Sequence, residues 1–472
     1  MDQILYWNSV ALESDRVAHT EIKPVERGSR GPVGSSRALA MVHLAMHDAY
    51  FSIIGAAHGT WLASPPVAAN GSSYQAAIAV AAHSTLTALY PAQTARLDRA
   101  LREAGLHGPG IGRGGAHGQA IGGAVLRARM GDPGLGDHDY QPEVAPTGHR
   151  PDPAQPRQGY YAPHYGSRSR CFAVTDRYTL DAPPKANDAA YLAALREVRA
   201  KGITVESIAA QPARSAARTP DENLTALFWA YDGAKHIGTA PRLYNQIARE
   251  LALAQPNTVE QNARLFALIN AGIADAAILC WDEKYRHNLW RPILGIREYD
   301  PATGPDAVPG HDLDPDCDPF WQPHGSPRSN EIAPNFTPPY PSYPSGHAAL
   351  GGTAFQILRR FYGFDADGPD TLTNGMGFVS DELDGLAADN RGVVRTRHVR
   401  CFPGGLWQMM RENARSRVFL GVHWSFDAYA ADARGGMDLT RNIGGVRLGR
   451  EVADNVWANG LKQDRAAAAR LS

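Results

Sequence analysis

The chain has 472 residues, of which 43% are hydrophobic and 20% charged, a composition typical of a globular protein with a large buried core. Its formal net charge of −1 excludes a general attraction to nucleic acid or anionic membranes. No basic run followed by an apolar segment opens the sequence, and the most apolar stretch, 265–281, is interrupted by Asn270 and Asp275. We therefore expect a soluble protein with no nucleic-acid partner and no membrane span, cytoplasmic or exported by an unconventional route.

Helical periodicity dominates the sequence. Two long stretches, 131–184 and 300–344, are instead rich in proline, glycine and aspartate and have no regular period. No strand alternation of useful length is present. Helices are expected at 36–54, 74–104 (with a break or start at Pro91), 119–130, 188–201, 221–232, 241–254, 259–290, 345–362, 405–421, 424–434 and 448–460.

This pattern predicts an all-α fold of two four-helix bundles with long irregular loops. We expect one domain over 1–472, with a first helical part at about 1–185 and a second at about 186–472. The sequence leaves the oligomeric state open, and a homo-oligomer is compatible with it.

The four cysteines, Cys171, Cys280, Cys317 and Cys401, are scattered along the chain. They lack both the paired spacing of a metal site and the density of a disulfide framework. We expect free thiols, although the sequence alone leaves a disulfide open.

A first candidate functional segment runs from Lys284 to Arg291 and Pro292. Seven residues at 100° each place the lysine and the arginine about 20° from one helix face. Pro292 disfavours helical geometry at Arg291, so the arginine is expected where the helix ends. Alone, this segment is more typical of a solvated basic helix end.

The second segment is the run Pro344-Ser345-Gly346-His347. Pro344 and Ser345 are typical of a helix start, with Ser345 as the N-cap. Gly346 removes a side chain where a ligand must approach the backbone, and His347 lies in the first turn. A helix N-terminus of this kind binds anions, although an ordinary capped helix with a surface histidine has the same sequence signature.

The third segment contains Arg417, Gly421, His423 and Asp427. At four residues' separation, the carboxylate of Asp427 can hold one ring nitrogen of His423 and leave the other free as a ligand or nucleophile. Arg417 lies about 120° away on an unbroken helix, but Gly421 permits a bend. A buried structural His–Asp pair would have the same spacing.

The combination of the three segments points to an oxyanion site. Lys284, Arg291 and Arg417 are three cations, and arginine forks match the geometry of oxyanions. The helix N-terminus adds neutral donors, and the two histidines offer a ligand nitrogen and a group placed for proton transfer. The residues therefore predict a site for a tetrahedral trianion, either phosphate or vanadate.

The three segments read K-x6-R-P, P-S-G-H and S-R-x5-H-x3-D, which resembles the motif set of vanadium haloperoxidases and the type 2 phosphatidic acid phosphatase superfamily. Residues 6–8, 37–53, 228–233, 242–246, 264–268, 421–428 and 443–454 resemble the fungal-type vanadium chloroperoxidases. The membrane phosphatases of the superfamily need several spanning helices, which this sequence lacks. The resemblance therefore favours the haloperoxidase branch.

Carried over position by position, the resemblance implies that His423 bonds vanadium and that His347 acts as acid and base. It implies that Asp232 pairs with Arg417, and that Trp281 and Tyr340 line the halide side of the site. The oxygens of vanadate would be held by a set of donors: Lys284, Arg291, Ser345, the Gly346 N–H, His347 and Arg417.

The same resemblance implies the reaction. Vanadate would act as a Lewis acid, with phosphate able to replace it in the apo form. Hydrogen peroxide would lose a proton to His347 and be polarised by Lys284, and a halide would then be oxidised to hypohalous acid. Small organic acceptors would be halogenated by that product, and the cationic surroundings would offset the growing negative charge.

Position 340 departs from both branches of the family. Tyr340 stands where chloroperoxidases usually have phenylalanine and bromoperoxidases histidine. A neutral aromatic ring favours the chloride type, whereas the hydroxyl could form a hydrogen bond in the pocket and lower the oxidising power. The sequence therefore leaves chloride, bromide and iodide open.

Two other functions remain compatible with these residues. A soluble acid phosphatase would bind phosphate at the same place and use His423 as its nucleophile. Added vanadate would inhibit such a phosphatase and activate a haloperoxidase. A non-enzymatic helical oxyanion-binding protein is the second alternative, but it leaves the presence of both His347 and His423 without an explanation.

Overall fold

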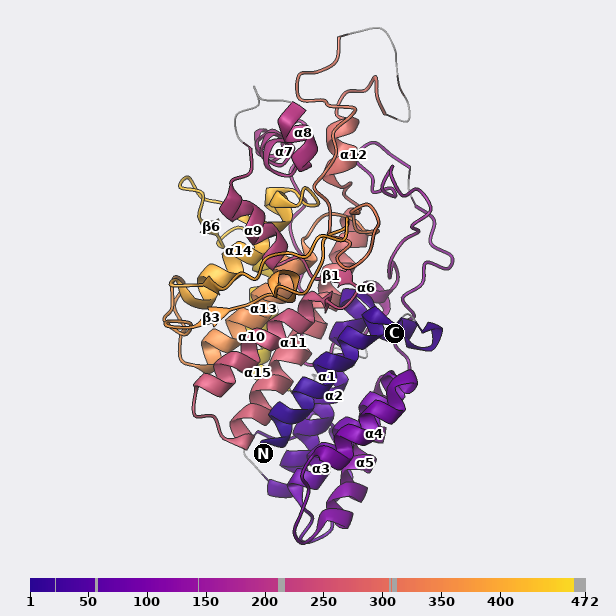
Figure 1. Cartoon of the computed structure of the whole chain (residues 1–472), viewed down its shortest axis with the longest axis vertical. Coiled ribbons are helices and arrows are strands. Elements are labelled where there is room, and N and C mark those ends of the chain that lie inside the picture. Colours follow the sequence, from indigo (N-terminus) through magenta and orange to yellow (C-terminus); the bar gives the residue numbers. More distant parts are fainter. Residues whose placement is uncertain are drawn as a thin grey trace.

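The computed structural model describes residues 1–21, 23–55, 58–142, 144–210, 217–304, 307 and 312–461. Within this part of the chain the fold is mainly helical, as expected, and its strands are limited to short two-stranded ribbons (Figure 1). The elements of the first part are α1 (Gln3–Thr20), η1 (Pro24–Ser29), α2 (Gly31–Ile54), α3 (Tyr74–Leu89), η2 (Pro91–Gln93), α4 (Thr94–Glu103), α5 (Ile111–Ala128) and α6 (Tyr165–Arg168).

The second part contains longer helices, short turns and the three ribbons. Its helices are α7 (Ala189–Lys201), α8 (Val205–Ala210), α9 (Pro220–Phe228), α10 (Ala240–Ala254), α11 (Val259–His287), α12 (Pro292–Arg297), α13 (Gly346–Phe361), η3 (Asp381–Leu383), α14 (Gly405–Phe419), η4 (Ser425–Asp427) and α15 (Gly445–Asn459). The antiparallel ribbons pair β1 (Asp232–Ala234) with β2 (Gly238–Thr239), β3 (Gly377–Phe378) with β4 (Arg400–Cys401), and β5 (Ala430–Ala431) with β6 (Met437–Asp438).

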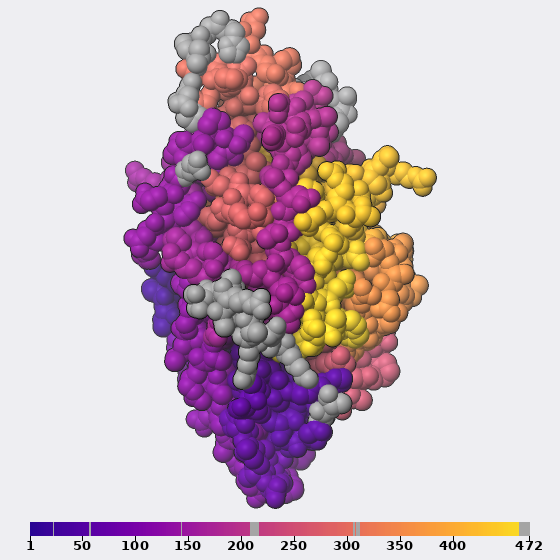
Figure 2. Space-filling view, turned by 180° about the vertical axis from the view of Figure 1, so that it is seen from behind, coloured from indigo at the N-terminus to yellow at the C-terminus, as the bar shows by residue number. Residues whose placement is uncertain are grey.

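Two helical bundles meet along α11. In the first bundle α2, α3 and α5 pack together with α1 and α4, and in the second α11, α13 and α15 pack with α10 and α14. Seen from the opposite side, the N-terminal segment forms the narrow end of the molecule and the C-terminal segment lies against the part around α7 (Figure 2). One continuous hydrophobic core includes residues of both bundles. Helix α11 is long and apolar enough to span a bilayer, but 94% of its apolar window is buried inside the protein.

A buried polar network ties the two bundles together at their centre. Asn8 of α1 donates its amide to His43 of α2 at 3.0 Å and to Asn245 of α10 at 3.2 Å. Asn245 and Asn270 of α11 exchange hydrogen bonds of 2.8 and 2.9 Å. Because Nδ1 of His43 donates to the carbonyl of Leu39 at 2.7 Å, its Nε2 must be the acceptor and the ring is neutral.

Close contact between α13 and α15 fixes the start of α13. A Cβ atom at Gly445 would lie 2.3 Å from the carbonyl oxygen of Ser345, and one at Gly449 would lie 2.2 Å from that of Ala349. No side chain fits such distances, so glycine is required at both positions. The result is a rigid support directly behind Ser345.

Most expected helices are confirmed, and their predicted and observed ends differ by at most about three turns. The break expected at Pro91 is confirmed as well. The helix expected at 424–434 is wrong. Gly421 has φ +72°, which ends the preceding helix, and Asp427 accepts the N–H of Trp424 at 3.0 Å, which closes a short 3-10 turn before β5. The sequence interpretation also missed α1, whose buried face includes the polar Asn8, Ser14 and Asp15. All four cysteines are free thiols, as expected.

Candidate functional site

The candidate site lies where four segments meet: the end of α11 with the start of α12, the loop before α13, the end of α14 with the turn after it, and β1. The last turns of α11 carry Trp281 and Lys284, and Arg291 is the N-cap of α12. The loop before α13 carries Tyr340 and ends in Ser345, the N-cap of α13. Further contributions come from the end of α14 and the turn after it, and from β1, which carry Arg417, His423 and Asp232.

Arg291 is fully buried and connects two of these segments. Its Nε donates to the carbonyl of Tyr340 at 2.9 Å, and its Nη1 donates to the carbonyl of Val422 at 2.7 Å. The same Nη1 lies 3.0 Å from Nε2 of His423. Because a guanidinium only donates, Nε2 of His423 is the acceptor in this contact. Burial lowers the pKa of Arg291 to about 10, so the side chain stays charged at neutral pH.

His423 is held by Asp427 as the spacing predicted, although through a 3-10 turn and not along a helix. Its Nδ1 lies 2.8 Å from Oδ2 of Asp427, which also accepts the hydroxyl of Ser342 and the N–H of Trp424. The carboxylate therefore fixes the proton on Nδ1 and leaves a lone pair on Nε2. Burial, followed by the charges of Arg291 and Lys284, holds the pKa of His423 well below its usual value. The imidazole is neutral and suited to bond an electrophilic centre.

Lys284 is completely buried and holds the loop that precedes α13. Its Nζ donates to the carbonyls of Pro341 at 3.0 Å, Ser342 at 3.0 Å and Pro344 at 2.5 Å. An ammonium group has three N–H donors, so all of them are engaged. Burial lowers the pKa of Lys284, and Arg291 adds to this effect. Lys284 and Arg291 thus both hold the loop before α13. The shared helix face expected from their spacing does not extend to Arg291, because α11 ends first and Arg291 is the N-cap of α12.

The N-terminus of α13 presents backbone donors to the site. Ser345 caps the helix by accepting the N–H of Ala348 at 3.4 Å, and its own N–H donates to the carbonyl of Asp427 at 2.8 Å. A Cβ at Gly346 would meet the Trp281 ring at 3.4 Å, which is an ordinary contact. Packing alone therefore does not require glycine at 346, and its absent side chain leaves the N–H at the helix start open to an anion.

His347 is 8% exposed and has one ring nitrogen engaged. Its Nε2 donates to the carbonyl of Ala230 at 2.7 Å, which leaves Nδ1 as the acceptor in the neutral ring. Burial and the charge of Arg417 lower the pKa of His347 to about 3. The neutral form with a free Nδ1 is therefore the form present at neutral pH.

Arg417 forms a buried ion pair with Asp232. Its Nη2 lies 2.9 Å from each carboxylate oxygen of Asp232, and the two side chains are 1% and 3% exposed. Nη2 also lies 3.4 Å from the hydroxyl of Ser326, and Nη1 lies 3.4 Å from the carbonyl of Ala230. The same carbonyl thus contacts both Arg417 and His347.

The donor set fits a tetrahedral oxyanion. Within the described part of the chain, Nη2 of Arg291 and Nε of Arg417 are buried donors without a hydrogen-bond acceptor. Each such donor costs about 1–3 kcal/mol, and an oxyanion bound between them would remove that cost. Together with the N-terminus of α13 and the Nε2 lone pair of His423, which accepts from Arg291 at 3.0 Å, these atoms can hold vanadate or phosphate.

Aromatic rings form one wall beside this donor set. The ring centroids of Trp281 and Tyr340 lie 4.8 Å apart, and Tyr161 lies 6.0 Å from each of them. Lys284 lies 5.3 Å and Arg291 4.9 Å from the centroid of the Tyr340 ring. Burial raises the pKa of Tyr340 to about 12, so its hydroxyl is neutral.

The structure brings together all ten residues selected from the sequence and adds others. Tyr161, which the sequence interpretation missed, belongs to the irregular stretch 131–184 and had no periodic signal. Ser342 was also missed, although its place three residues before the Ser345 cap was a usable signal. The carbonyl of Ala230 had no sequence signal, because any residue type supplies one.

Comparison with known proteins agrees with this site. Residues 1–104 match the vanadium chloroperoxidase (VCPO) N-terminal domain, and residues 264–462 match the VCPO second helical-bundle domain. The vanadium chloroperoxidase of Curvularia inaequalis is 35% identical over 97% of this chain and 90% of its own length.

Solved structures with the same fold include two bacterial enzymes. The first bacterial vanadium-dependent iodoperoxidase superposes with a TM-score of 0.66 at 19% identity, covering 96% of each chain. A holo-type bacterial vanadium-dependent chloroperoxidase superposes with a TM-score of 0.64 at 16% identity, covering 94% of this chain and 95% of that one. On the domain matches and the fungal relative, the chain belongs to the vanadium chloroperoxidase family.

Proposed function

We propose that this protein is a vanadium-dependent haloperoxidase that oxidises a halide with hydrogen peroxide to hypohalous acid. The observation that carries the proposal is the neutral His423, whose Nε2 lone pair lies 3.0 Å from the buried Arg291. The orphaned donors of Arg291 and Arg417 beside it call for an anion that also accepts a nitrogen ligand. Bound vanadate would supply a Lewis acid that activates peroxide, and the oxidation state of vanadium would stay unchanged.

Each residue has a part in this proposal. Nε2 of His423 would bond the metal, and Arg291, Arg417, Ser345 and the Gly346 N–H would hold its oxygens. His347, with Nδ1 free, would accept a proton from hydrogen peroxide, while the Ala230 carbonyl keeps the ring oriented. Asp232 would hold Arg417 in place through its two hydrogen bonds.

The hydrogen bonds of Lys284 sharpen its proposed part. All three of its N–H groups are engaged by loop carbonyls. These contacts support a role in positioning the loop and supplying positive charge, which stabilises negative charge that develops during peroxide activation. Trp281 and Tyr340 would form the halide side, where the rings exclude water from the reacting groups.

The test is peroxide-dependent iodination, bromination and chlorination of a dye, with and without added orthovanadate. We expect turnover only with vanadate, and loss of turnover in His423→Ala. A phosphatase at this site would instead hydrolyse a phosphate ester and be inhibited by vanadate. The absence of vanadate-dependent turnover with all three halides would contradict the proposal. Tyr340→Phe serves as the variant that reports whether the hydroxyl restricts the halide range.

Finer features remain proposals. Phosphate would occupy the site when vanadate is absent, which inhibition of vanadate loading by phosphate would measure. Homo-oligomerisation would appear as a larger mass in size-exclusion chromatography with light scattering. A cytoplasmic location or an unconventional export route would be decided by fractionation of the producing cells.

A further inference from the structure

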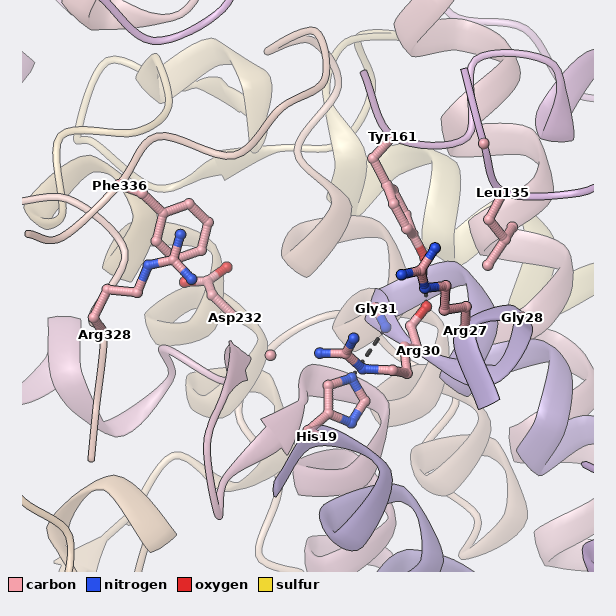
Figure 3. Close-up of a pocket in the computed structure, with 12 residues that line it drawn as sticks. His19, Arg27, Gly28, Arg30, Gly31, Leu135, Tyr161, Asp232, Arg328 and Phe336 are labelled. Atoms are coloured by element: carbon pink, nitrogen blue, oxygen red, sulfur yellow. Dashed lines mark hydrogen bonds between the residues drawn. The ribbon is translucent and has the colours of Figure 1, made fainter. Parts of the chain in front are cut away.

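A pocket of about 460 Å³ lies beside the candidate oxyanion site (Figure 3). Figure 3 shows Arg328 and Phe336 on one side of it, and Arg27, Arg30 and Tyr161 on the other. Its walls come from the end of α1, η1, the start of α2, the stretch 135–161, β1 and the long loop before α13. A volume of this size suits an organic molecule and is far larger than a halide ion needs.

The charges of the pocket favour an anion. Arg27, Arg30 and Arg328 have no salt bridge to any residue in the described ranges, and within these ranges the guanidinium of Arg328 donates one hydrogen bond, to the amide oxygen of Gln155 at 3.4 Å. Asp232 is the carboxylate of the lining, and Arg417 already neutralises it. His19 accepts the N–H of Gly31 at 3.0 Å on Nε2 and donates to the carbonyl of Asp15 on Nδ1, so its ring is neutral.

The pocket also has apolar and aromatic walls. The guanidinium of Arg328 lies 4.2 Å from the centroid of the Phe336 ring, and apart from the contact of Nη2 with Gln155 its N–H groups have no hydrogen-bond acceptor among the described residues. Leu135 and the ring of Tyr161 add apolar surface. A ligand that is complementary to both the cationic and the apolar walls has an aromatic ring and a carboxylate.

Two residues join this pocket to the reaction site. Asp232 lines the pocket and bonds Arg417, and Tyr161 lines it and packs against Trp281 and Tyr340. A molecule bound in the pocket is therefore next to the place where hypohalous acid would be formed.

We propose that this pocket binds the organic acceptor, and that the acceptor is an electron-rich aromatic carboxylate whose charge is recognised by Arg27, Arg30 and Arg328. The proposal rests on the haloperoxidase function proposed above. In the reaction a ring carbon forms a bond to the halogen of hypohalous acid as the halogen–oxygen bond breaks. The ring proton and the released hydroxide leave as water, so no further oxidant is required.

Binding is tested first, without vanadate or peroxide, so that it does not depend on catalysis. The probes are 4-hydroxyphenylacetate and its neutral analogue 4-hydroxyphenylacetamide, compared by ligand-observed NMR titration. We expect the carboxylate to bind about tenfold more tightly than the amide, and the double variant Arg27→Gln/Arg328→Gln to remove most of this difference. Arg102→Gln, at an exposed arginine of α4 outside the pocket, is the matched control.

Product selectivity is tested next, with both probes present at equal concentration during bromination. The ratio of brominated carboxylate to brominated amide is compared with the ratio that free hypobromous acid gives. We expect the enzyme to favour the carboxylate about tenfold over the free reagent, and the double variant to approach the free-reagent ratio. Triiodide formation is followed in parallel, so that loss of halide oxidation is distinguished from loss of acceptor binding. Equal affinity for the two probes, or an unchanged preference in the double variant, would overturn the proposal.

Discussion

At the candidate oxyanion site Arg291 and Arg417 are 0% and 1% exposed, whereas in the neighbouring pocket Arg30 and Arg328 are half-buried and Arg27 is exposed. The buried pair is surrounded by partners: carbonyl oxygens hold Arg291, and a carboxylate holds Arg417. The pocket arginines have no ion pair within the described part of the chain. One region therefore fixes its cations in place, and the other leaves them available to a ligand.

The physical reason for the difference is desolvation. A buried guanidinium loses its hydration and must recover that free energy from fixed dipoles and charges, which also sets its position. This preorganisation is what stabilisation of a developing charge requires. The half-exposed arginines keep part of their hydration, so their attraction for an anion is weaker and is screened by salt. The comparison predicts large effects of substitutions at the buried site and smaller, salt-sensitive effects in the pocket.

The largest effect is expected for His347→Ala. Under the proposed function, loss of the Nδ1 acceptor would remove proton transfer from peroxide and lower kcat/KM by about 10²–10⁴-fold. Steady-state halide oxidation at saturating vanadate measures it. His83→Ala, at a half-buried histidine of α3, is the control and should stay near wild-type activity. If His347→Ala kept kcat/KM within a few-fold of wild type, this buried histidine would have no part in proton transfer.

The contrast between buried and exposed groups extends to stability against acid. Burial lowers the pKa of His43 to about 4, below its ordinary value of 6.5. Because the pKa of His43 is lower in the folded state, the stabilisation of the fold by its neutral ring is complete above about pH 6.5 and is lost as the pH falls to about 4. The shift lowers the free energy of unfolding by on the order of 3 kcal/mol over this pH range.

Urea unfolding of wild type and His43→Gln between pH 7.5 and 4 checks this expectation. Glutamine does not titrate, so the wild-type advantage should shrink as the pH falls. For the control His83→Gln, the difference in free energy of unfolding from wild type should change much less over the same pH range. A wild-type advantage that is independent of pH would contradict a neutral His43 in the central polar network.

The sequence predicted those parts of the site that depend on local patterns. Ser345 and Gly346 are recognisable as a helix start, and the spacing of His423 and Asp427 predicted their hydrogen bond. The helices of the second bundle were predicted equally well, because their apolar repeat continues over many residues. The helix expected at 424–434 failed because Asp427 bonds the backbone of its own turn, which competes with helix formation.

What the sequence did not predict depends on contacts between distant segments. Helix α1 buries Asn8 against His43 and Asn245, so polar residues interrupt its apolar face and conceal the helix. The arginine pocket joins Arg30 near the N-terminus to Arg328 in an irregular loop. Single arginines in loops have no distinguishing pattern, and only the tertiary fold shows that they face one cavity.

Asp232 belongs to both regions, and Asp232→Asn therefore separates them. The variant keeps one acceptor oxygen for Arg417 but loses the second, so the guanidinium is no longer held in one orientation and vanadate should bind about 10–100-fold more weakly. The acceptor pocket becomes more positive, and the affinity for 4-hydroxyphenylacetate should stay equal or rise slightly. Vanadate titration of activity and NMR titration of the probe measure the two effects.

The matched control for this substitution is Asp98→Asn, which removes a half-exposed carboxylate that pairs with His83 at 2.8 Å. It should change neither affinity. A parallel loss of vanadate and probe binding in Asp232→Asn would mean that the two regions form a single site, and the distinction between fixed and available cations would fail.

The smallest effect is expected from salt. Raising sodium nitrate from 20 to 500 mM shortens the Debye length to a few ångströms, which weakens attraction between the exposed Arg27 and a carboxylate. The preference for the carboxylate acceptor over its amide should fall a few-fold, because exposed ion pairs contribute about 1 kcal/mol or less each. Vanadate held by the buried Arg291 and Arg417 should be lost far less readily, since little solvent reaches these side chains. Competition bromination and vanadate titration across the salt series compare the two. Equal salt dependence at both places would show that burial does not protect the oxyanion site, and a preference that salt leaves unchanged would show that Arg27 and its neighbours do not recognise the acceptor's charge.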